Sequence, residues 1–207
     1  MANLEPLIQS IPVAPLKLAS LEGCRTLADQ VNNYLVSFRH ESPTNVGQAD
    51  SLQGYCADSY LLECECPRFG SGEGKGVLKE SVRGCDLFIM VDVTNYSLTY
   101  RVNGYENHMS PDNHYQDLKR IISAADGKAR RINVIMPFLY EGRQHKRSKR
   151  ESLDCALMLQ ELVDMGVSNI LTFDAHDPRV SNSIPLHGFD SFMPTYQFLK
   201  ALVNSVP

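Results

Sequence analysis

Apolar residues recur at helical spacing in three stretches of the chain, and each stretch predicts an amphipathic helix. The three stripes are Cys24, Leu27, Val31, Leu35 and Phe38; Tyr115, Leu118, Ile122 and Ala125; and Cys155, Met158, Leu159 and Leu162. Ser110-Pro111 is a typical start for the second helix. Gly127 and Gly166 are typical ends for the second and third helices. A fourth helix is expected over residues 195–203.

Short apolar runs predict strands between these helices. Residues 87–91 form a continuous apolar run of strand length, which is typical of a strand with both faces covered. Residues 131–136 and 169–173 predict two further strands, and residues 60–66 alternate towards their end as a strand does. Strands that alternate with helices indicate a parallel α/β sheet, in which ligands bind beyond the carboxyl ends of the strands.

The rest of the chain predicts irregular structure. Residues 1–15 contain three prolines and predict an extended arm, followed by a single domain over residues 16–207. Polar, turn-rich sequence predicts loops at residues 42–54 and 94–109.

Composition narrows the class of protein. With 207 residues, 43 % hydrophobic and 21 % charged, the chain matches an ordinary globular domain and not a disordered or fibrous protein. A net charge of −4 argues against a general nucleic-acid-binding protein. No apolar run approaches the ~18 residues of a membrane-spanning helix, and the N-terminus does not resemble a signal peptide. We therefore expect a cytoplasmic protein.

Six cysteines and several isolated histidines carry no chemical motif. The cysteines lack the paired Cys-x-x-Cys spacing typical of zinc sites, so zinc is not expected. Cys64 and Cys66 occupy alternate positions of a predicted strand, so both thiols should point to one face, which we expect to be the core. His40, His108 and His114 are expected at the surface.

Basic residues gather directly after the predicted strand at residues 131–136. Residues 143–150 (Arg-Gln-His-Lys-Arg-Ser-Lys-Arg) contain five of the chain's 20 lysines and arginines. They lead into a predicted helix start, where backbone amides and the helix dipole also favour anions. This segment, the basic loop, predicts a polyphosphate site; a solvated basic surface is the alternative.

Asp174 and His176 follow the predicted strand at residues 169–173. Alternate positions of an extended chain point the same way, so both side chains can face one ligand. A carboxylate and an imidazole are reasonable donors for a divalent cation. The alternative is an aspartate that caps the next turn.

Residues 70–76 (Gly-Ser-Gly-Glu-Gly-Lys-Gly), the glycine-rich segment, invite comparison with nucleotide-binding loops. The spacing matches neither the phosphate-binding loop nor the dinucleotide fingerprint. Taken alone, the segment predicts a flexible hairpin.

Together these motifs resemble the family of ribose-phosphate pyrophosphokinases (phosphoribosyl pyrophosphate synthetases). Residues 134–151 are similar to the family's Ile-Pro-Tyr strand end, its Arg-Gln-Asp-Arg-Lys segment and the Ser-Arg-Glu that follows. Residues 172–176 (Thr-Phe-Asp-Ala-His) resemble Thr-Met-Asp-Leu-His. Residues 68–73 (Arg-Phe-Gly-Ser-Gly-Glu) resemble Arg-Phe-Ser-Asp-Gly-Glu, and residues 81–84 keep its register to Ser-Ile-Arg-Gly. The resemblance covers the chain from about Leu16 and implies a phosphoribosyltransferase-like (Rossmann-like) N-terminal domain.

The resemblance also implies residue roles. It implies ATP contacts for Phe69, Glu73, Arg143, Gln144, Lys146 and Arg150. Asp174 and His176 are implied to serve the magnesium of Mg-ATP, with His176 as the catalytic residue. Phe69 and Glu73 are implied to reach the adenine bound by a neighbouring subunit, so a homo-oligomer is expected.

Several residues depart from the family pattern. His145 replaces the Asp that follows Arg-Gln, and Ser71 replaces an Asp or Asn of the glycine-rich motif. Ser183 and His187 stand where the family has two carboxylates. The family's later ribose 5-phosphate segments find no counterpart in these 207 residues, so we expect this chain alone to bind ATP without turning it over.

The function implied is that of an ATP-binding and oligomerisation domain of a ribose-phosphate diphosphokinase. That enzyme transfers diphosphate from Mg-ATP to ribose 5-phosphate, giving phosphoribosyl pyrophosphate and AMP. A non-catalytic subunit or scaffold is the alternative, because Ser183 and His187 replace carboxylates. A module that binds RNA or polyphosphate through the basic loop is a third possibility; no nucleic-acid or membrane partner is expected.

Overall fold

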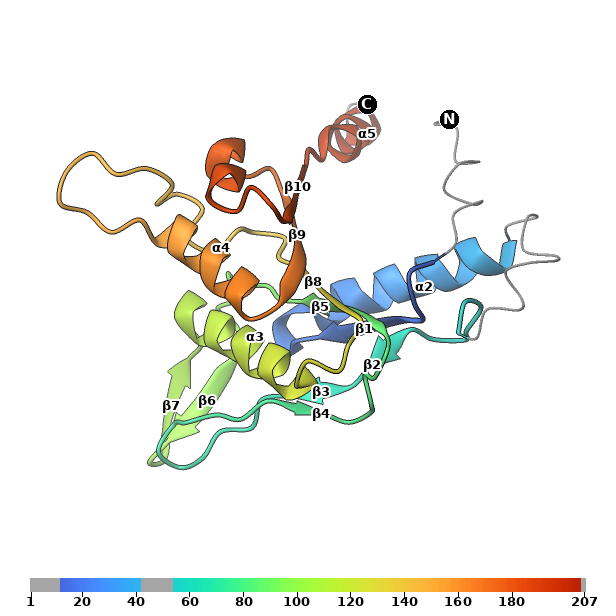
Figure 1. Ribbon diagram of the computed structural model, residues 1–207, viewed down its shortest axis with the longest axis horizontal. Coiled ribbons are helices and arrows are strands. Elements are labelled where there is room, and N and C mark those ends of the chain that lie inside the picture. Colours follow the sequence, from blue (N-terminus) through green and yellow to red (C-terminus); the bar gives the residue numbers. More distant parts are fainter. Residues whose placement is uncertain (1–11, 42–53, 206–207) are drawn as a thin grey trace.

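The computed structural model describes residues 12–41 and 54–205 and is built around a six-stranded parallel sheet (Figure 1). The strand order is β10-β9-β8-β5-β1-β2. These strands span Gly188–Phe192, Val167–Phe173, Arg131–Ile135, Asp86–Met90, Leu16–Ser20 and Leu61–Leu62, in that order. All neighbouring pairs are parallel, so the carboxyl ends of the strands meet at one edge of the sheet. The fold is therefore the parallel α/β architecture that the sequence predicts.

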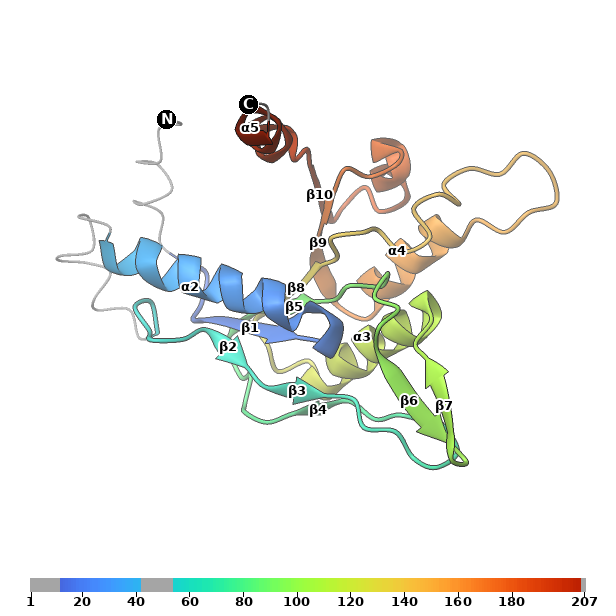
Figure 2. The same ribbon diagram turned by 180° about the vertical axis from the view of Figure 1, so that it is seen from behind.

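Helices cover the sheet on both faces (Figure 2). One face packs against α2 (Arg25–Glu41), which a 3-10 turn (Glu22–Cys24) precedes, through a small cluster that includes Leu18, Ala28 and Met90. The other face packs against α3 (Pro111–Ala125) and α4 (Asp154–Asp164) in a much larger apolar cluster. Alternate residues of each strand point to opposite clusters, because the side-chain period of a strand is two. The face that packs on α3 and α4 is therefore fully covered, whereas Phe88 and Ile135 on the α2 face are only partly buried.

The predicted helices are present, with differences at their ends and faces. All four predicted apolar residues of α3 and all four of α4 are buried. In α2 the prediction was wrong at Leu27, which is exposed, because Ala28 and Asn32 occupy the buried positions. The α3 helix ends at Ala125, two residues before Gly127, since Asp126 already adopts a left-handed conformation with φ of 52°.

The strand predictions missed part of the sheet. Strands β1 and β10 were not predicted from the sequence. The stretch 60–66 was predicted as one strand, but the chain changes partner within it. Strand β2 pairs with β1 in the main sheet, whereas β3 (Cys64–Glu65) pairs with β4 (Val77–Leu78) in a separate two-stranded sheet. This small sheet carries the glycine-rich segment away from the main one.

The loop predicted at residues 94–109 contains a β-hairpin. Strands β6 (Thr99–Val102) and β7 (Tyr105–His108) pair antiparallel around a tight turn at Asn103 and Gly104. His114, predicted at the surface, is buried and its Nε2 lies 2.6 Å from the carbonyl oxygen of Asn95. The hairpin is thus anchored to α3 through a histidine that no sequence motif marks.

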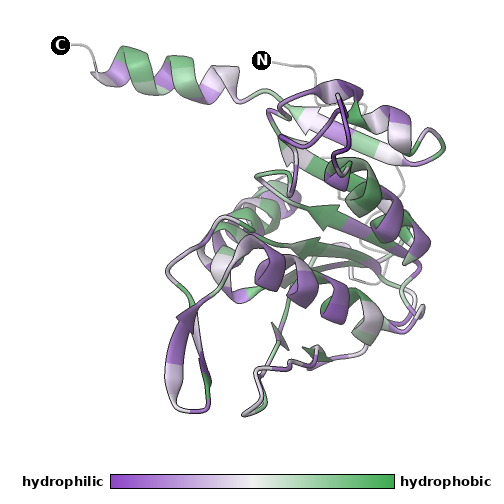
Figure 3. Ribbon diagram, turned by 90° about the vertical axis from the view of Figure 1, so that its left-hand side faces the viewer, coloured by the Kyte–Doolittle hydropathy of each residue, from purple (hydrophilic) through white to green (hydrophobic). Residues whose placement is uncertain are grey.

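The C-terminal helix α5 (Thr195–Ser205), predicted from the sequence, projects from the body of the domain (Figure 3). It buries none of its residues. Across residues 12–41 and 54–205, no helix is long and apolar enough to cross a membrane. Most of the predicted N-terminal arm and of the predicted loop at residues 42–54 lies outside the described residues.

Candidate functional site

A hollow of about 390 Å³ opens beyond the carboxyl ends of β8 and β9. Its walls come from the segment after β8 (Phe138, Leu139, Gly142 and Arg143) and from the end of β9 (Phe173, Asp174, Ala175 and His176). The two segments are distant in sequence, but β8 and β9 are neighbours in the sheet. The fold therefore brings Arg143, Asp174 and His176 around one cavity at the edge where α/β sheets bind ligands.

Backbone contacts fix the end of β9. The amide of Phe173 donates to the carbonyl oxygen of Pro137 at 3.3 Å, and the amide of Asp174 donates to that of Phe192 at 2.9 Å. Asp174 has a positive φ of 45°, a conformation that aspartate tolerates better than most residues. The resulting turn leaves the Asp174 and His176 side chains exposed beside the hollow.

The side chain of Arg143 stands at the mouth of the hollow. Its guanidinium lies over the Phe138 ring, 5.8 Å from the centroid. An arginine held over an aromatic face keeps its planar donors directed and available for oxyanions. Arg143 is exposed, so a ligand can reach these donors from solvent.

The contacts that fix the basic loop to the domain lie at its base. The Gln144 side chain donates to the carbonyl oxygen of Ser152 at 2.6 Å, which joins the two ends of the loop. Lys146 and Arg150 are exposed on the part that extends away from the body of the domain (Figure 1). Arg143 thus lines the hollow, Gln144 closes the loop, and Lys146 and Arg150 lie beyond the closure.

The glycine-rich segment and the basic loop extend from different parts of the domain, the first beside the β6–β7 hairpin and the second from the start of α4 (Figures 1 and 2). It forms a tight hairpin, as predicted, in which the Phe69 amide donates to the Glu73 carbonyl oxygen at 2.7 Å. Phe69 is 53 % exposed, and the Glu73 carboxylate accepts a hydrogen bond from the Ser71 hydroxyl at 2.8 Å. Neither Phe69 nor Glu73 lines the hollow beside Arg143, and both side chains face solvent.

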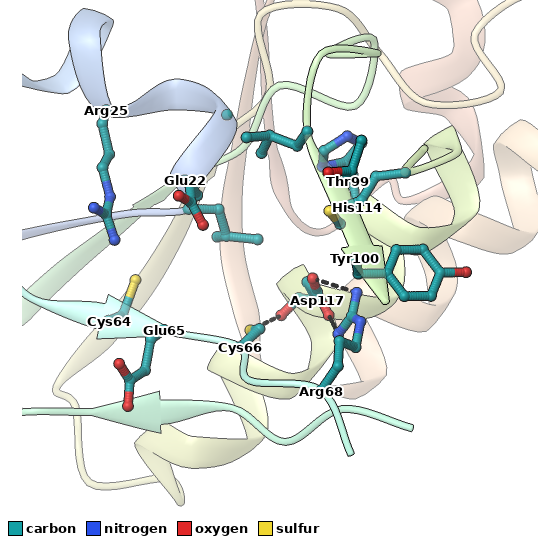
Figure 4. Close-up of a pocket in the computed structure, with 14 residues that line it drawn as sticks. Glu22, Arg25, Cys64, Glu65, Cys66, Arg68, Thr99, Tyr100, His114 and Asp117 are labelled. Carbon is teal, nitrogen blue, oxygen red and sulfur yellow. Dashed lines mark hydrogen bonds and ion pairs between the residues drawn. The ribbon is translucent and has the colours of Figure 1, made fainter. Parts of the chain in front are cut away.

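A buried ion network supports this hairpin (Figure 4). Arg68 donates to both carboxylate oxygens of Asp117 on α3, at 2.6 and 2.8 Å, and Arg120 donates to one of them at 2.6 Å. The side chains of Arg68 and Asp117 are only 9 % and 6 % exposed. The Arg68 guanidinium also lies 5.4 Å from the ring centroid of Tyr100 on β6. One arginine thus joins the glycine-rich hairpin, α3 and the β6–β7 hairpin.

Close packing explains two of the glycines. A Cβ on Gly76 would lie 2.4 Å from the backbone oxygen of Arg120, and one on Gly72 would lie 2.9 Å from a methyl group of Val102. Gly72 also has a φ of 92°. These glycines allow the chain to approach α3 and the β6–β7 hairpin, which is a packing role and not phosphate binding.

The donor set at the hollow fits a nucleotide-bound magnesium ion. Among residues 12–41 and 54–205, no three His, Cys, Asp or Glu side chains converge as a metal cage requires. Magnesium usually takes one or two carboxylates together with phosphate oxygens and waters, and Asp174 with a neighbouring triphosphate meets that pattern. Neither Ser183 nor His187 lines the hollow, and the Ser183 hydroxyl donates to the Val180 carbonyl oxygen at 2.8 Å.

Burial rather than metal binding describes Cys64 and Cys66. Cys64 is buried and Cys66 packs partly buried against the core, as the alternation predicts. Burial raises the pKa of Cys64 to about 11. Burial, with Asp117 nearby, raises the pKa of Cys66 to about 12. Both thiols are therefore protonated at neutral pH.

Sequence reasoning missed two buried aspartates. Asp117 organises the support of the glycine-rich hairpin, and Asp177 contacts the basic loop. Both are buried although aspartate is rarely so unless it is paired. Asp117 sits at a helical spacing among apolar residues of α3, which could have marked it. Asp177 follows His176 directly, and its partner on the basic loop, His145, lies far away in sequence.

Similarity to known proteins agrees with the fold. The ribose-phosphate pyrophosphokinases of Corynebacterium ammoniagenes and Bacillus cereus are each 29 % identical to this chain over 167 residues, which is 80 % of this chain and 41 % of each relative. The ribose-phosphate pyrophosphokinase of Bacillus caldolyticus is 30 % identical over 122 residues, 58 % of this chain and 34 % of the relative. The chain thus spans about two fifths of the length of the first two relatives.

A solved structure has the same fold. The crystal structure of phosphoribosylpyrophosphate synthetase from Mycobacterium smegmatis superimposes with a TM-score of 0.69 and 21 % identity, covering 92 % of this chain and 52 % of that one. The model of the N-terminal domain of ribose phosphate pyrophosphokinase matches residues 16–166, which is more than half of the chain. This chain belongs to the family of ribose phosphate pyrophosphokinase N-terminal domains.

Proposed function

We propose that this chain is the ATP-binding domain of a ribose-phosphate diphosphokinase. The observation that carries the proposal is the meeting of Arg143, Asp174 and His176 around one hollow at the carboxyl edge of the sheet. A cation, a carboxylate and an imidazole at that edge suit a magnesium-bound triphosphate. The enzyme would pass the β,γ-diphosphoryl group of ATP to the 1-hydroxyl of ribose 5-phosphate.

The residues at the hollow would act by holding charge in place. Diphosphoryl transfer depends mainly on positioning and on stabilisation of phosphate charge. Arg143 would bind phosphate oxygens, and Asp174 and His176 would hold the magnesium end of the nucleotide. Bound magnesium would neutralise charge on the transferring group. Gln144 would keep Arg143 in place by closing the loop, and Lys146 and Arg150 would add attraction from the loop beyond it.

Adenine would be bound between copies of the chain. Phe69 and Glu73 lie on the glycine-rich hairpin and do not line the hollow of their own chain, and the exposed Phe69 ring offers a face on which a purine can stack. Base–aromatic stacking contributes about 1–3 kcal/mol. A homo-oligomer in which one copy offers the phosphate site and its neighbour offers Phe69 and Glu73 follows from this arrangement.

Titration calorimetry with Mg-ATP tests the proposal. Arg143→Ala should weaken binding by about 1.5–3 kcal/mol, the usual contribution of a hydrogen bond to a charged group. Lys149→Ala is the matched control, because it removes a charge from the same loop beyond the Gln144 closure. Equal effects of the two substitutions would favour a solvated basic surface instead. A steep salt dependence without preference for adenine would favour nucleic-acid binding.

Turnover would distinguish an enzyme from a scaffold. We expect the 207-residue chain alone to bind Mg-ATP without releasing AMP in the presence of ribose 5-phosphate, since positioning both reactants contributes about 7–11 kcal/mol to such reactions. Addition of the C-terminal half of a relative should restore AMP release. A non-catalytic subunit is the second candidate, because Ser183 and His187 stand in place of two family carboxylates; it predicts binding without turnover in both cases.

A further inference from the structure

One contact joins the start of the basic loop to the segment after β9. The Nδ1 atom of His145 lies 3.1 Å from Oδ2 of Asp177, and both side chains are only 11 % exposed. The His145 ring also meets the His176 ring edge-on, with 5.2 Å between centroids. His145, near the start of the basic loop, therefore contacts both Asp177 and His176, the residue that borders the hollow.

Asp177 is a fixed partner in this contact. The Arg179 guanidinium donates to both of its carboxylate oxygens, at 2.9 and 2.6 Å, and the Arg179 amide donates to Oδ1 at 3.0 Å. These bonds hold the pKa of Asp177 well below its usual range, so the carboxylate is charged at neutral pH. The Arg179 side chain itself is 79 % exposed, so its charge adds little to the hollow. Asp177 also caps the 3-10 helix over Pro178–Ser183.

We propose that the His145–Asp177 contact is a clamp that positions the phosphate site. It fixes the first residues of the basic loop against the end of β9, so that Arg143 and His176 face the same hollow. His145 and Asp177 are positioning residues and not ligands; the inference rests on the proposed function for its effect on Mg-ATP, whereas the clamp itself is a property of the free chain. The family's aspartate at position 145 would place two carboxylates together here. Histidine at position 145 is therefore compatible with Asp177, whereas the family's residue is not.

A series of substitutions at position 145 isolates the clamp. Asn can present an amide donor near the place of the histidine Nδ1, whereas Asp has the same shape but brings a carboxylate towards Asp177. His145→Asn should therefore preserve the clamp, and His145→Asp should break it. His145→Ala removes the contact without repulsion. Lys149→Ala is the control, because it changes an exposed residue of the same loop that is not part of this contact.

Two measurements test the clamp and its effect on Mg-ATP binding. Amide hydrogen exchange of the free chain over residues 143–155 and 174–180 should become ~10-fold or more faster in the Asp variant, as loss of a hydrogen bond to a charged group implies. Mg-ATP affinity should fall by a similar ~10-fold or more in the Asp variant and stay within ~3-fold of the parent in the Asn variant. The unfolding midpoint should be alike in the Asn and Asp variants, since the change is local.

The outcomes separate the clamp from the proposed function. Equal exchange rates in the Asn and Asp variants overturn the clamp. Faster exchange in the Asp variant with unchanged Mg-ATP affinity overturns its positioning role. A parent chain that does not bind Mg-ATP overturns the proposed function, while the exchange rates still decide whether the clamp exists.

Discussion

The glycine-rich segment and the basic loop both extend from the domain and both carry residues implied in nucleotide binding, yet they are held differently. The glycine-rich hairpin rests on a buried network in which Arg68 and Arg120 share Asp117, and on the β6–β7 hairpin. The basic loop is fixed only at its base, by Gln144 and by His145. A rigid support suits a surface that presents an aromatic ring, whereas a loop that closes over phosphates needs freedom beyond its base.

The difference has a physical origin in charge. Arg68 pairs with the buried Asp117, so its guanidinium can lie inside the protein. Most of the basic loop's charges stay exposed, because packing like charges together without anions is unfavourable. One region thus uses its cations for structure, and the other leaves most of them exposed to solvent.

Removal of the buried Asp117 carboxylate should have the largest effect on the stability of the glycine-rich hairpin and the fold. Asp117→Ala leaves the nearly buried Arg68 without its partner and should lower the free energy of unfolding by about 3–5 kcal/mol. Urea unfolding followed by circular dichroism measures the change. Glu65→Ala, which breaks the exposed pair with Lys79, is the control and should cost less than about 1 kcal/mol. A small loss for Asp117→Ala would mean that the hairpin does not depend on this network.

A methyl group at the base of the hairpin should have the next largest effect. Gly76→Ala forces a shift against the Arg120 backbone and should destabilise the fold by about 1–3 kcal/mol. Gly70→Ala meets no atom within 4 Å and serves as the matched control. The same urea titration compares them; equal stabilities would show that the hairpin can move away from α3 freely.

Alkaline pH should lower the stability of the fold around Cys64 and Cys66, by a smaller amount than these substitutions. Cys64 and Cys66 have raised pKa values in the folded chain, so they stay protonated at pH values where the unfolded thiols ionise. Stability from these thiols is therefore complete below about pH 8.5 and is lost as the pH rises towards 11 to 12. The urea midpoint should fall between pH 8 and pH 10.5, and Cys66→Ala should fall less steeply. An equal slope in the variant would contradict the assignment to Cys66.

Exposed hydrogen bonds at the two tips should matter least for stability. The Ser71 hydroxyl donates to Glu73, and the Ser148 hydroxyl donates to Glu151 at 3.0 Å. Ser71→Ala and Ser148→Ala should each change the free energy of unfolding by less than about 0.5 kcal/mol, because water replaces both bonds. A larger loss of unfolding free energy for either variant would mean that the exposed turn, and not the base, stabilises that region.

Local sequence patterns predicted the parts of the site that depend on neighbouring residues. Apolar stripes predicted α3 and α4, and the motifs around Arg143 and Asp174 were placed after strands, where a parallel sheet brings them to one edge. The convergence of Arg143, Asp174 and His176 on one hollow agrees with that placement. Their roles in ATP and magnesium binding stay predictions.

The long-range pairings could not be predicted from the sequence, because they depend on how the chain packs. Strand β10 is half-exposed and short of apolar residues, so its identity depends on pairing with β9 and not on its own pattern. The Arg68–Asp117 pair joins residues 49 positions apart, and His145 meets Asp177 from another strand end. Local periodicity was sufficient to predict the central alternation of strands and helices and the residues at the ends of β8 and β9. Which charges are neutralised inside the fold and which remain free was decided by packing, because a buried charge depends on its distant partner.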